Sequence, residues 1–180
     1  MNVKEIKLKN GETAVLREPT KEDAKKMIEY LNIIGGESDF VTFGKNEFTL
    51  SIEAEEDYIE KNNNTENCKI ILTIINDEIV GIASISSIQK ERMKHNGTLG
   101  ISVRKKYWGM GLGNEAMSYL IEWAKCNGIT KKISLLVRED NKRGIKLYEN
   151  FGFEKEGLLK KDICVRGIYY NTITMGFYID

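Results

Sequence analysis

A glycine-rich turn, Gly109-Met110-Gly111-Leu112-Gly113, most restricts how this chain folds, because it joins a β-rich run to an amphipathic helix. The run before it, Thr98 to Val103, has the composition of a strand. The residues that share one helix face after it are Ala116, Leu120, Trp123 and Ala124. A helix N-terminus presents free backbone N–H groups and the positive end of the helix dipole. The turn is therefore suited to a phosphate-bearing ligand, since glycine lets an anion approach the amides and accepts positive φ.

The spacing of these glycines excludes two familiar nucleotide sites. A dinucleotide-binding turn reads G-x-G-x-x-G after the first strand of a βαβ unit, whereas this one reads G-x-G-x-G late in the chain. A Walker A loop ends in Gly-Lys-Ser/Thr, whereas this turn ends in Gly113-Asn114-Glu115. Taken alone, the turn is also compatible with a tight bend and close helix packing.

The rest of the chain predicts one undivided domain over residues 1–180, with strands and helices in alternation. The Thr20-x-x-Asp23 motif resembles a capping box and predicts a helix that ends at Gly35-Gly36. Residues 37–49 form an irregular segment, a candidate substrate lid, before Ser51 caps a second helix. The other expected elements are strands over 13–18, 68–75, 79–88, 98–103, 132–137, 154–165 and 168–178, a helix that follows the glycine-rich turn and ends at a Gly128 cap, and a helix over 141–151.

Composition narrows the class of protein. Lys plus Arg and Asp plus Glu each number 27, so no net charge draws the chain to nucleic acid or to an anionic membrane. The first residues lack the apolar core of a signal peptide, and no apolar run is long enough to span a membrane, which predicts a cytoplasmic protein. The 3 cysteines, without C-x-x-C spacing, are expected to be reduced and mostly buried, and no metal site is expected.

A second sequence block follows about 30 residues after the turn. It runs from Asn141 to Phe153 and reads Asn-Lys-Arg-Gly-Ile-Lys-Leu-Tyr-Glu-Asn-Phe-Gly-Phe. The two blocks together resemble the GNAT family of N-acetyltransferases, whose motifs are Arg/Gln-x-x-Gly-x-Gly/Ala and Asn-x-x-Ala/Gly-x-x-Leu-Tyr-x-x-x-Gly-Phe. One position departs from this pattern, because Trp108 stands where the family has Arg or Gln.

The resemblance implies an α/β (α+β) fold with a mixed, mostly antiparallel sheet whose fourth and fifth strands, over 98–103 and 132–137, splay apart. It implies acetyl-CoA as cosubstrate, with its pantetheine arm entering between these strands. The residues implied to bind it are Ile101, Ser102, Val103, Gly109, Met110, Gly111, Leu112, Gly113, Asn114 and Asn141.

The resemblance also implies that Tyr148 is the catalytic acid, protonating the departing thiolate with a phenol whose ordinary pKa is about 10. On periodicity alone, Tyr148 reads as a core residue and Asn141 as a helix N-cap.

No general base is assigned. Similar enzymes that acetylate ribosomal-protein amino termini place a glutamate at the position of Leu136. A water chain to Glu37 or Asp39 is an alternative, although loop carboxylates are usually solvated. His95, the only histidine, is expected to be exposed at a strand end.

The function expected from the resemblance is transfer of an acetyl group to a primary amine of a small molecule or peptide, with an L-amino acid as one candidate. The alternatives are a non-catalytic CoA-binding regulatory module and a protein-interaction domain. Homodimers are common among similar proteins, so a homodimer is an expectation too.

Overall fold

The computed structural model describes residues 3–180, which form an eight-stranded sheet in the order β1-β2-β3-β4-β5-β6-β8-β7. Every neighbouring pair is antiparallel except β5 and β6, which are parallel. The strands are β1 (Lys4–Lys7), β2 (Thr13–Arg17), β3 (Lys69–Ile75), β4 (Glu78–Ser87), β5 (Asn96–Val103), β6 (Lys132–Arg138), β7 (Glu154–Val165) and β8 (Ile168–Tyr178). The predicted α/β fold with a mixed, mostly antiparallel sheet is confirmed.

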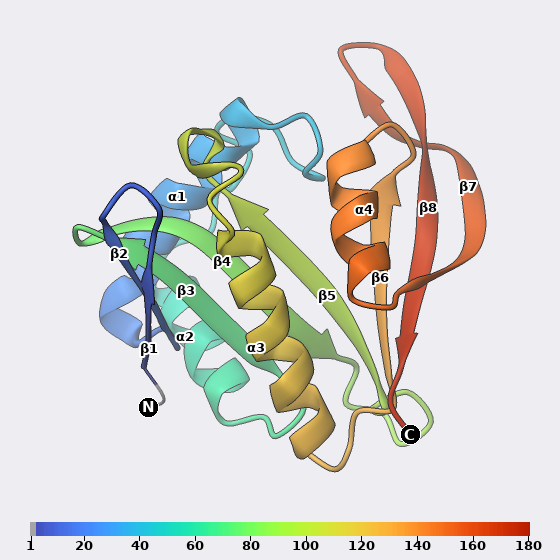
Figure 1. Ribbon diagram of the computed structural model, residues 1–180, viewed down its shortest axis with the longest axis horizontal. Coiled ribbons are helices and arrows are strands. Elements are labelled where there is room, and N and C mark those ends of the chain that lie inside the picture. Colours follow the sequence, from blue (N-terminus) through green and yellow to red (C-terminus); the bar gives the residue numbers. More distant parts are fainter. Residues whose placement is uncertain (1–2) are drawn as a thin grey trace.

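Helices cover both faces of the sheet (Figure 1). They are α1 (Ala24–Glu37), α2 (Ile52–Asn63), α3 (Leu112–Cys126) and α4 (Lys142–Asn150), with short 3₁₀ turns at Lys21–Asp23 and Lys105–Tyr107. Side chains of α1 and α2 pack with Ile70 and Leu72, whereas those of α3 and α4 pack with Ile71. Successive residues of a strand point to opposite faces, so β3 is apolar on both sides because helices cover both.

The β5 and β6 strands diverge after a short paired segment. Only Asn96–Thr98 and Lys132–Ser134 are in register, and beyond them the two strands separate toward their carboxyl ends (Figure 1). The predicted splay is therefore present. These are the fifth and sixth strands instead of the fourth and fifth, because the short strand β1, which the sequence reading missed, pairs with β2.

The prediction that Gly35-Gly36 ends the first helix is wrong, because α1 continues through both glycines to Glu37. A Cβ atom on Gly35 would lie 2.2 Å from the carbonyl oxygen of Gly44. The glycine therefore allows the segment between α1 and α2 to pack against the helix backbone, instead of terminating the helix.

Other local predictions are confirmed. The Asp23 carboxylate accepts the backbone N–H of Thr20 at 2.8 Å, and the Ser51 hydroxyl accepts that of Ala54 at 3.2 Å. Gly128 and Gly152, just beyond the ends of α3 and α4, have φ angles of 73° and 90°, which favour glycine.

The cysteines are only partly as expected. All three are free, but only Cys68 is buried, whereas Cys126 and Cys164 are exposed. Cys126 lies in the last turn of α3, and Cys164 lies near the end of β7. Whether a side chain at either position is buried depends on its tertiary contacts, which the sequence pattern does not show. Among residues 3–180, no helix is long and apolar enough to cross a membrane.

Candidate functional site

The open edge of β5 forms one side of the gap in the sheet where β5 and β6 diverge, here termed the cleft. From Leu99 to Val103, no strand within residues 3–180 pairs with this edge, although β4 pairs with the other edge. One of its carbonyl groups is already bonded, because Val103 accepts the indole N–H of Trp108 at 2.7 Å. Ile101 therefore offers backbone groups that suit an extended ligand, whereas the backbone groups of Ser102, which lies opposite Ile82, face β4.

The glycine-rich turn lies at the wide end of this cleft and forms the start of α3. Gly109 and Gly111 have φ angles of 85° and 87°, which only glycine adopts readily. The first intrahelical bond runs from Glu115 N–H to the Gly111 carbonyl at 3.1 Å. The N–H groups of Leu112, Gly113 and Asn114 consequently have no helix carbonyl to donate to.

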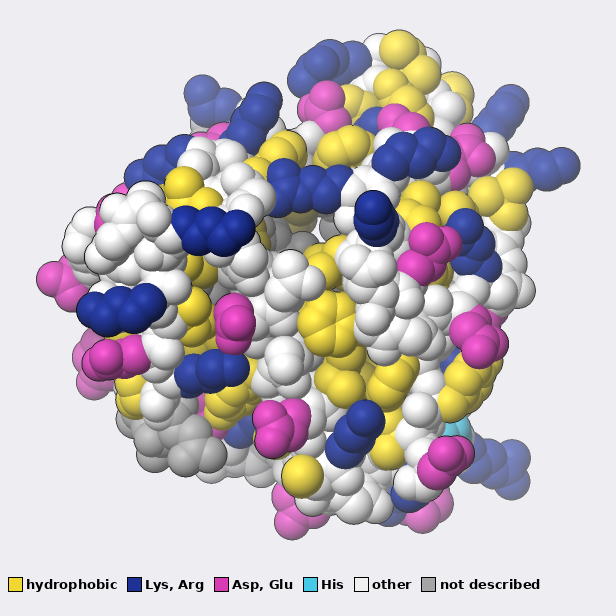
Figure 2. Space-filling view, viewed as in Figure 1, with side chains coloured by type: hydrophobic (Ala, Val, Ile, Leu, Met, Phe, Trp, Pro, Cys, Tyr) yellow, Lys and Arg dark blue, Asp and Glu magenta, His cyan; other side chains and the backbone are white. Residues whose placement is uncertain are grey.

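The space in front of the turn is open. Cβ atoms placed on Gly109 or Gly111 would meet no heavy atom within 4 Å. Lys and Arg side chains gather along the same upper part of this face (Figure 2). The corner thus combines free amides, a helix N-terminus, basic surroundings and room, which together fit a pyrophosphate.

Trp108, the residue that departs from the motif pattern, makes contacts within the protein through its side chain. Besides the bond to Val103, its ring lies 5.1 Å from the guanidinium carbon of Arg143 in the first turn of α4. Attraction between a guanidinium group and an aromatic face stabilises such pairs. Trp108 therefore braces the end of β5 and holds a cation beside the glycine-rich turn.

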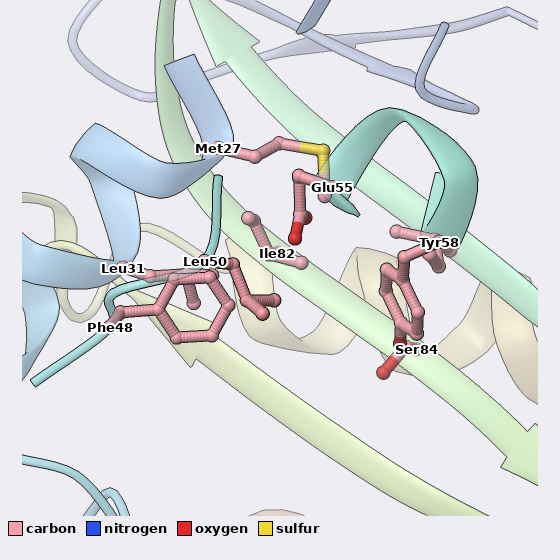
Figure 3. Close-up of a pocket in the computed structure, with 9 residues that line it drawn as sticks. Met27, Leu31, Phe48, Leu50, Glu55, Tyr58, Ile82 and Ser84 are labelled. Atoms are coloured by element: carbon pink, nitrogen blue, oxygen red, sulfur yellow. The ribbon is translucent and has the colours of Figure 1, made fainter. Parts of the chain in front are cut away.

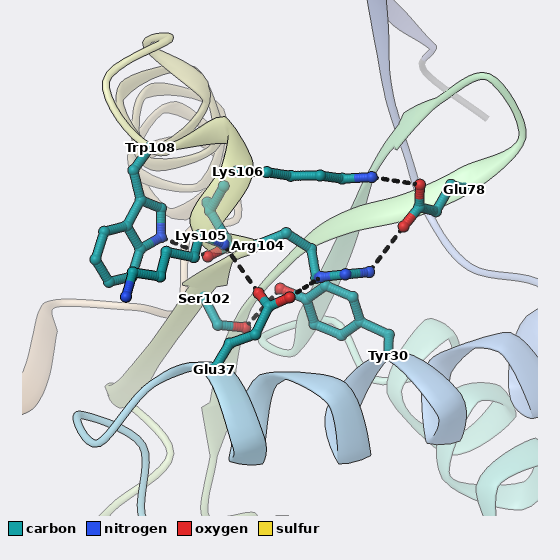
Figure 4. Close-up of polar contacts among 9 residues, drawn as sticks. Tyr30, Glu37, Glu78, Ser102, Arg104, Lys105, Lys106 and Trp108 are labelled. Atoms are coloured by element: carbon teal, nitrogen blue, oxygen red, sulfur yellow. Dashed lines mark hydrogen bonds and ion pairs between the residues drawn. The ribbon is translucent and has the colours of Figure 1, made fainter.

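A polar network fixes the chain between β5 and the glycine-rich turn (Figure 4). Arg104, the residue after β5, donates to Glu37 at 2.9 Å and to Glu78 at 2.7 Å. The second oxygen of Glu37 accepts the backbone N–H of Lys105 at 3.0 Å, and Lys106 donates to Glu78 at 2.9 Å. Both Glu37 oxygens are thus engaged, which makes this residue a structural clamp and not a free base.

The segment between α1 and α2 is tied to β6 and to the β7–β8 turn. The buried guanidinium of Arg138 donates to the Asp39 carbonyl at 2.8 Å and lies 3.7 Å from the ring centroid of Tyr170. Arg166 in the turn pairs with the Asp39 carboxylate at 2.9 Å. These contacts carry the segment across the mouth of the cleft, and they occupy one oxygen of Asp39, the other carboxylate considered as a base.

Tyr148 packs in the hydrophobic cluster beneath α3 and α4. Its side chain is 9% exposed, and the cluster includes Leu99 of β5 and Val137 of β6, one from each diverging strand. Burial raises the pKa of Tyr148 to about 12. The phenol therefore stays protonated at neutral pH and keeps a proton that it can donate.

The remaining predicted positions have clear surroundings. Asn141 is the N-cap of α4, and its side-chain oxygen accepts the Gly144 N–H at 2.9 Å. Leu136 is 56% exposed on β6, so the position where similar enzymes carry a glutamate faces solvent but bears no base. His95 is exposed, and its carbonyl accepts the backbone N–H groups of Lys131 at 2.8 Å and Lys132 at 3.1 Å.

Comparison with known proteins gives a consistent result. The model of the acetyltransferase (GNAT) family matches residues 39–153. An acetyltransferase of the GNAT family from Streptococcus pneumoniae superimposes with a TM-score of 0.89 at 30% identity, over 93% of this chain and 99% of that one. The L-amino acid N-acetyltransferase AaaT of Escherichia coli is 31% identical over 107 residues, which are 59% of this chain and 66% of that protein. A putative acetyltransferase, yncA of Salmonella typhimurium, solved with its cofactor acetyl-CoA, shares the fold at a TM-score of 0.80 and 17% identity, over 93% of this chain and 94% of that one.

Proposed function

The chain belongs to the GNAT acetyltransferase family, and we propose that it transfers the acetyl group of acetyl-CoA to a primary amine of a small molecule or peptide. Members of this family are acyltransferases that use acetyl-CoA. The observation that carries the proposal is the pairing of the splayed cleft with an accessible glycine-lined helix N-terminus at its wide end.

The chain's own groups suit this cosubstrate. Amides of Gly111 to Asn114 would hold the pyrophosphate, and the open edge at Ile101 would bond the pantetheine amides. Val103 fits less well than expected from the sequence, because Trp108 already bonds its carbonyl. Acetyl-CoA, when bound, supplies a thioester that an uncharged amine can attack.

Tyr148 is the proposed acid for the departing sulfur. It extends from α4 into a cluster that contains residues of both diverging strands, and its raised pKa keeps the proton in place. Asn141 supports this geometry, since it caps α4 seven residues before Tyr148 and thereby fixes the start of the helix. A bond from Asn141 to the cofactor stays part of the proposal.

The acceptor amine is proposed to lose its proton to water. Leu136 carries no ionisable group, both oxygens of Glu37 are bonded, and Asp39 pairs with an arginine. With no free base at these three positions, turnover depends on the fraction of acceptor that is already uncharged, which grows as the pH rises.

The amino-acid acetyltransferase AaaT among its relatives makes amino-acid amines one candidate class of acceptor. We further propose that residues 1–180 form one catalytic domain. The protein is proposed to lie in the cytoplasm and to be active as a monomer or a homodimer.

The proposal is tested by two measurements. Calorimetry with acetyl-CoA should show binding to the wild-type chain and loss of binding in Gly111→Val, whose side chain would enter the open space and whose φ of 87° disfavours any β-branched residue. Release of free thiol from acetyl-CoA is then followed over a panel of amines, peptides, polyamines and aminoglycosides. Binding without thiol release for any acceptor would favour a non-catalytic CoA-binding module, and absence of binding would refute the proposal altogether.

A further inference from the structure

A second concave site lies on the opposite face of the sheet from the glycine-rich turn. It is a partly open cavity of about 320 Å³ between α1, α2 and the sheet, closed on one side by the segment that joins the two helices (Figure 3). Its lining is Met27, Leu31, Phe48, Leu50, Glu55, Tyr58, Ile70, Ile82 and Ser84. This volume is at the lower end of the range for small-molecule pockets, so the cavity suits a compact ligand or one side chain.

Glu55 is the only charged side chain in this lining. Its carboxylate points from α2 into the cavity (Figure 3), although the residue is only 1% exposed. Within the described residues 3–180, its Oε2 atom has no hydrogen-bond partner. An unpaired buried carboxylate destabilises a folded protein, and burial accordingly raises the pKa of Glu55. A bound ligand that donates a hydrogen bond to the Glu55 carboxylate would remove this unfavourable contribution to the stability of the fold.

The floor of the cavity lies one strand away from the cleft. Ile82 and Ser84 on β4 are in register with Ser102 and Gly100 on β5. Paired residues of neighbouring strands point to the same face, and the strands are about 4.8 Å apart. A small molecule lying on this floor is thus next to the strand whose open edge forms the wall of the proposed acetyl-CoA cleft.

We propose that this cavity binds the acceptor, and that the acceptor is a small amine with an aliphatic or aromatic group and no carboxylate. Its amino group donates an N–H to Oε2 of Glu55, while its apolar part contacts Leu31, Phe48 and Leu50. The inference rests on the proposed function and makes it more specific.

The absence of a carboxylate from the acceptor follows from charge. A free amino acid would bring its own carboxylate into an apolar cavity that already contains Glu55, and two like charges in such surroundings repel strongly. Amides and decarboxylated analogues keep the amine and the apolar group without that charge. They are therefore expected to be better acceptors than the free amino acids.

The first test compares matched acceptors. Thiol release at saturating acetyl-CoA is measured for leucinamide against leucine, and for phenethylamine against phenylalanine. We expect kcat/KM, calculated from the concentration of uncharged amine, to be at least about tenfold higher for the member of each pair without a carboxylate, since a buried like-charge contact is unfavourable by more than this factor. Equal or better turnover of the free amino acids would overturn the inference and leave the proposed function intact.

The second test uses variants of α2 and does not need turnover. Phenethylamine is titrated calorimetrically into wild type, Glu55→Gln and the control Glu56→Gln, which changes the next residue, outside the lining set. Losing a charged hydrogen-bond acceptor should weaken binding about 10- to 100-fold in Glu55→Gln, with no change in Glu56→Gln. The affinity for acetyl-CoA should be the same in all three proteins.

Each outcome of the second test is decisive. Equal affinity of Glu55→Gln and wild type, or no binding of phenethylamine to the wild type, would show that the cavity does not bind the acceptor in this way. The proposed function, in contrast, fails only if acetyl-CoA itself does not bind or if no amine releases its thiol.

Discussion

The adjacent glycines of α1 provide a matched pair of substitutions with opposite expected effects. In Gly35→Ala, the new methyl group would lie 2.2 Å from the carbonyl oxygen of Gly44 and 2.6 Å from its carbon. Both atoms belong to the backbone, so the segment between α1 and α2 must move. In Gly36→Ala, the nearest atoms are side-chain carbons of Lys45 at 3.4 Å, and a flexible lysine can shift away.

The magnitudes follow from two opposing effects. Overpacking destabilises by about 1–3 kcal/mol, whereas alanine in place of glycine within a helix stabilises by about 0.5–1 kcal/mol. Gly35→Ala should therefore lower the free energy of unfolding by about 0.5–2 kcal/mol, and Gly36→Ala should raise it by up to about 1 kcal/mol. For a chain of this length, the two midpoint temperatures should differ by about 2–12 °C.

Urea unfolding followed by circular dichroism measures the free energy of unfolding of each variant. The displaced segment also carries Phe48 and Leu50 of the cavity, so Gly35→Ala should raise KM for the acceptor while KM for acetyl-CoA changes little. Equal unfolding free energies for the two variants would refute the reasoning, because it assigns the difference entirely to contact with Gly44.

Three further predictions concern the site. Tyr148→Phe keeps the ring that packs beneath α4, so stability and acetyl-CoA affinity should be unchanged, while steady-state turnover with chemistry limiting should fall about 10²- to 10⁴-fold; near-normal turnover would make Tyr148 a packing residue only. Glu37→Ala removes the acceptors for Arg104 and for the Lys105 N–H, so calorimetry should show acetyl-CoA affinity reduced about 3- to 10-fold, whereas an unchanged affinity would mean that the clamp does not support the glycine-rich turn. Burial raises the pKa of Glu55 above its value in the unfolded chain, so ionisation of this carboxyl destabilises the fold as the pH rises from the ordinary carboxyl range. Glu55→Gln should therefore raise the midpoint of thermal unfolding at pH 7. The gain should vanish below about pH 4, where the carboxyl is protonated in both the folded and the unfolded state. A gain that is independent of pH would indicate a packing effect instead.

Much of the backbone was predictable because its signals are local. Ser51, Asn141, Gly128 and Gly152 begin or end helices through bonds and φ angles that involve only neighbouring residues. The glycine-rich turn is of the same kind, since a positive φ at Gly111 and the free amides after it follow from the start of a helix. Such features need no knowledge of the rest of the fold.

Tertiary structure decided which carboxylates are available for chemistry. Glu37 and Glu55 both read as ordinary polar residues of helical or loop segments, yet Glu37 is bonded to Arg104, which is 67 positions away in the chain. Glu55 is buried with an unpaired oxygen because α1, α2 and β4 meet around it. Gly35 likewise matters because the backbone of Gly44 packs closely against it. This contact depends on the path of the irregular segment between α1 and α2. Local rules determined where the proposed cofactor corner lies in this protein, whereas long-range packing determined the surroundings of the proposed acceptor site, because burial and charge pairing depend on which distant segments come together.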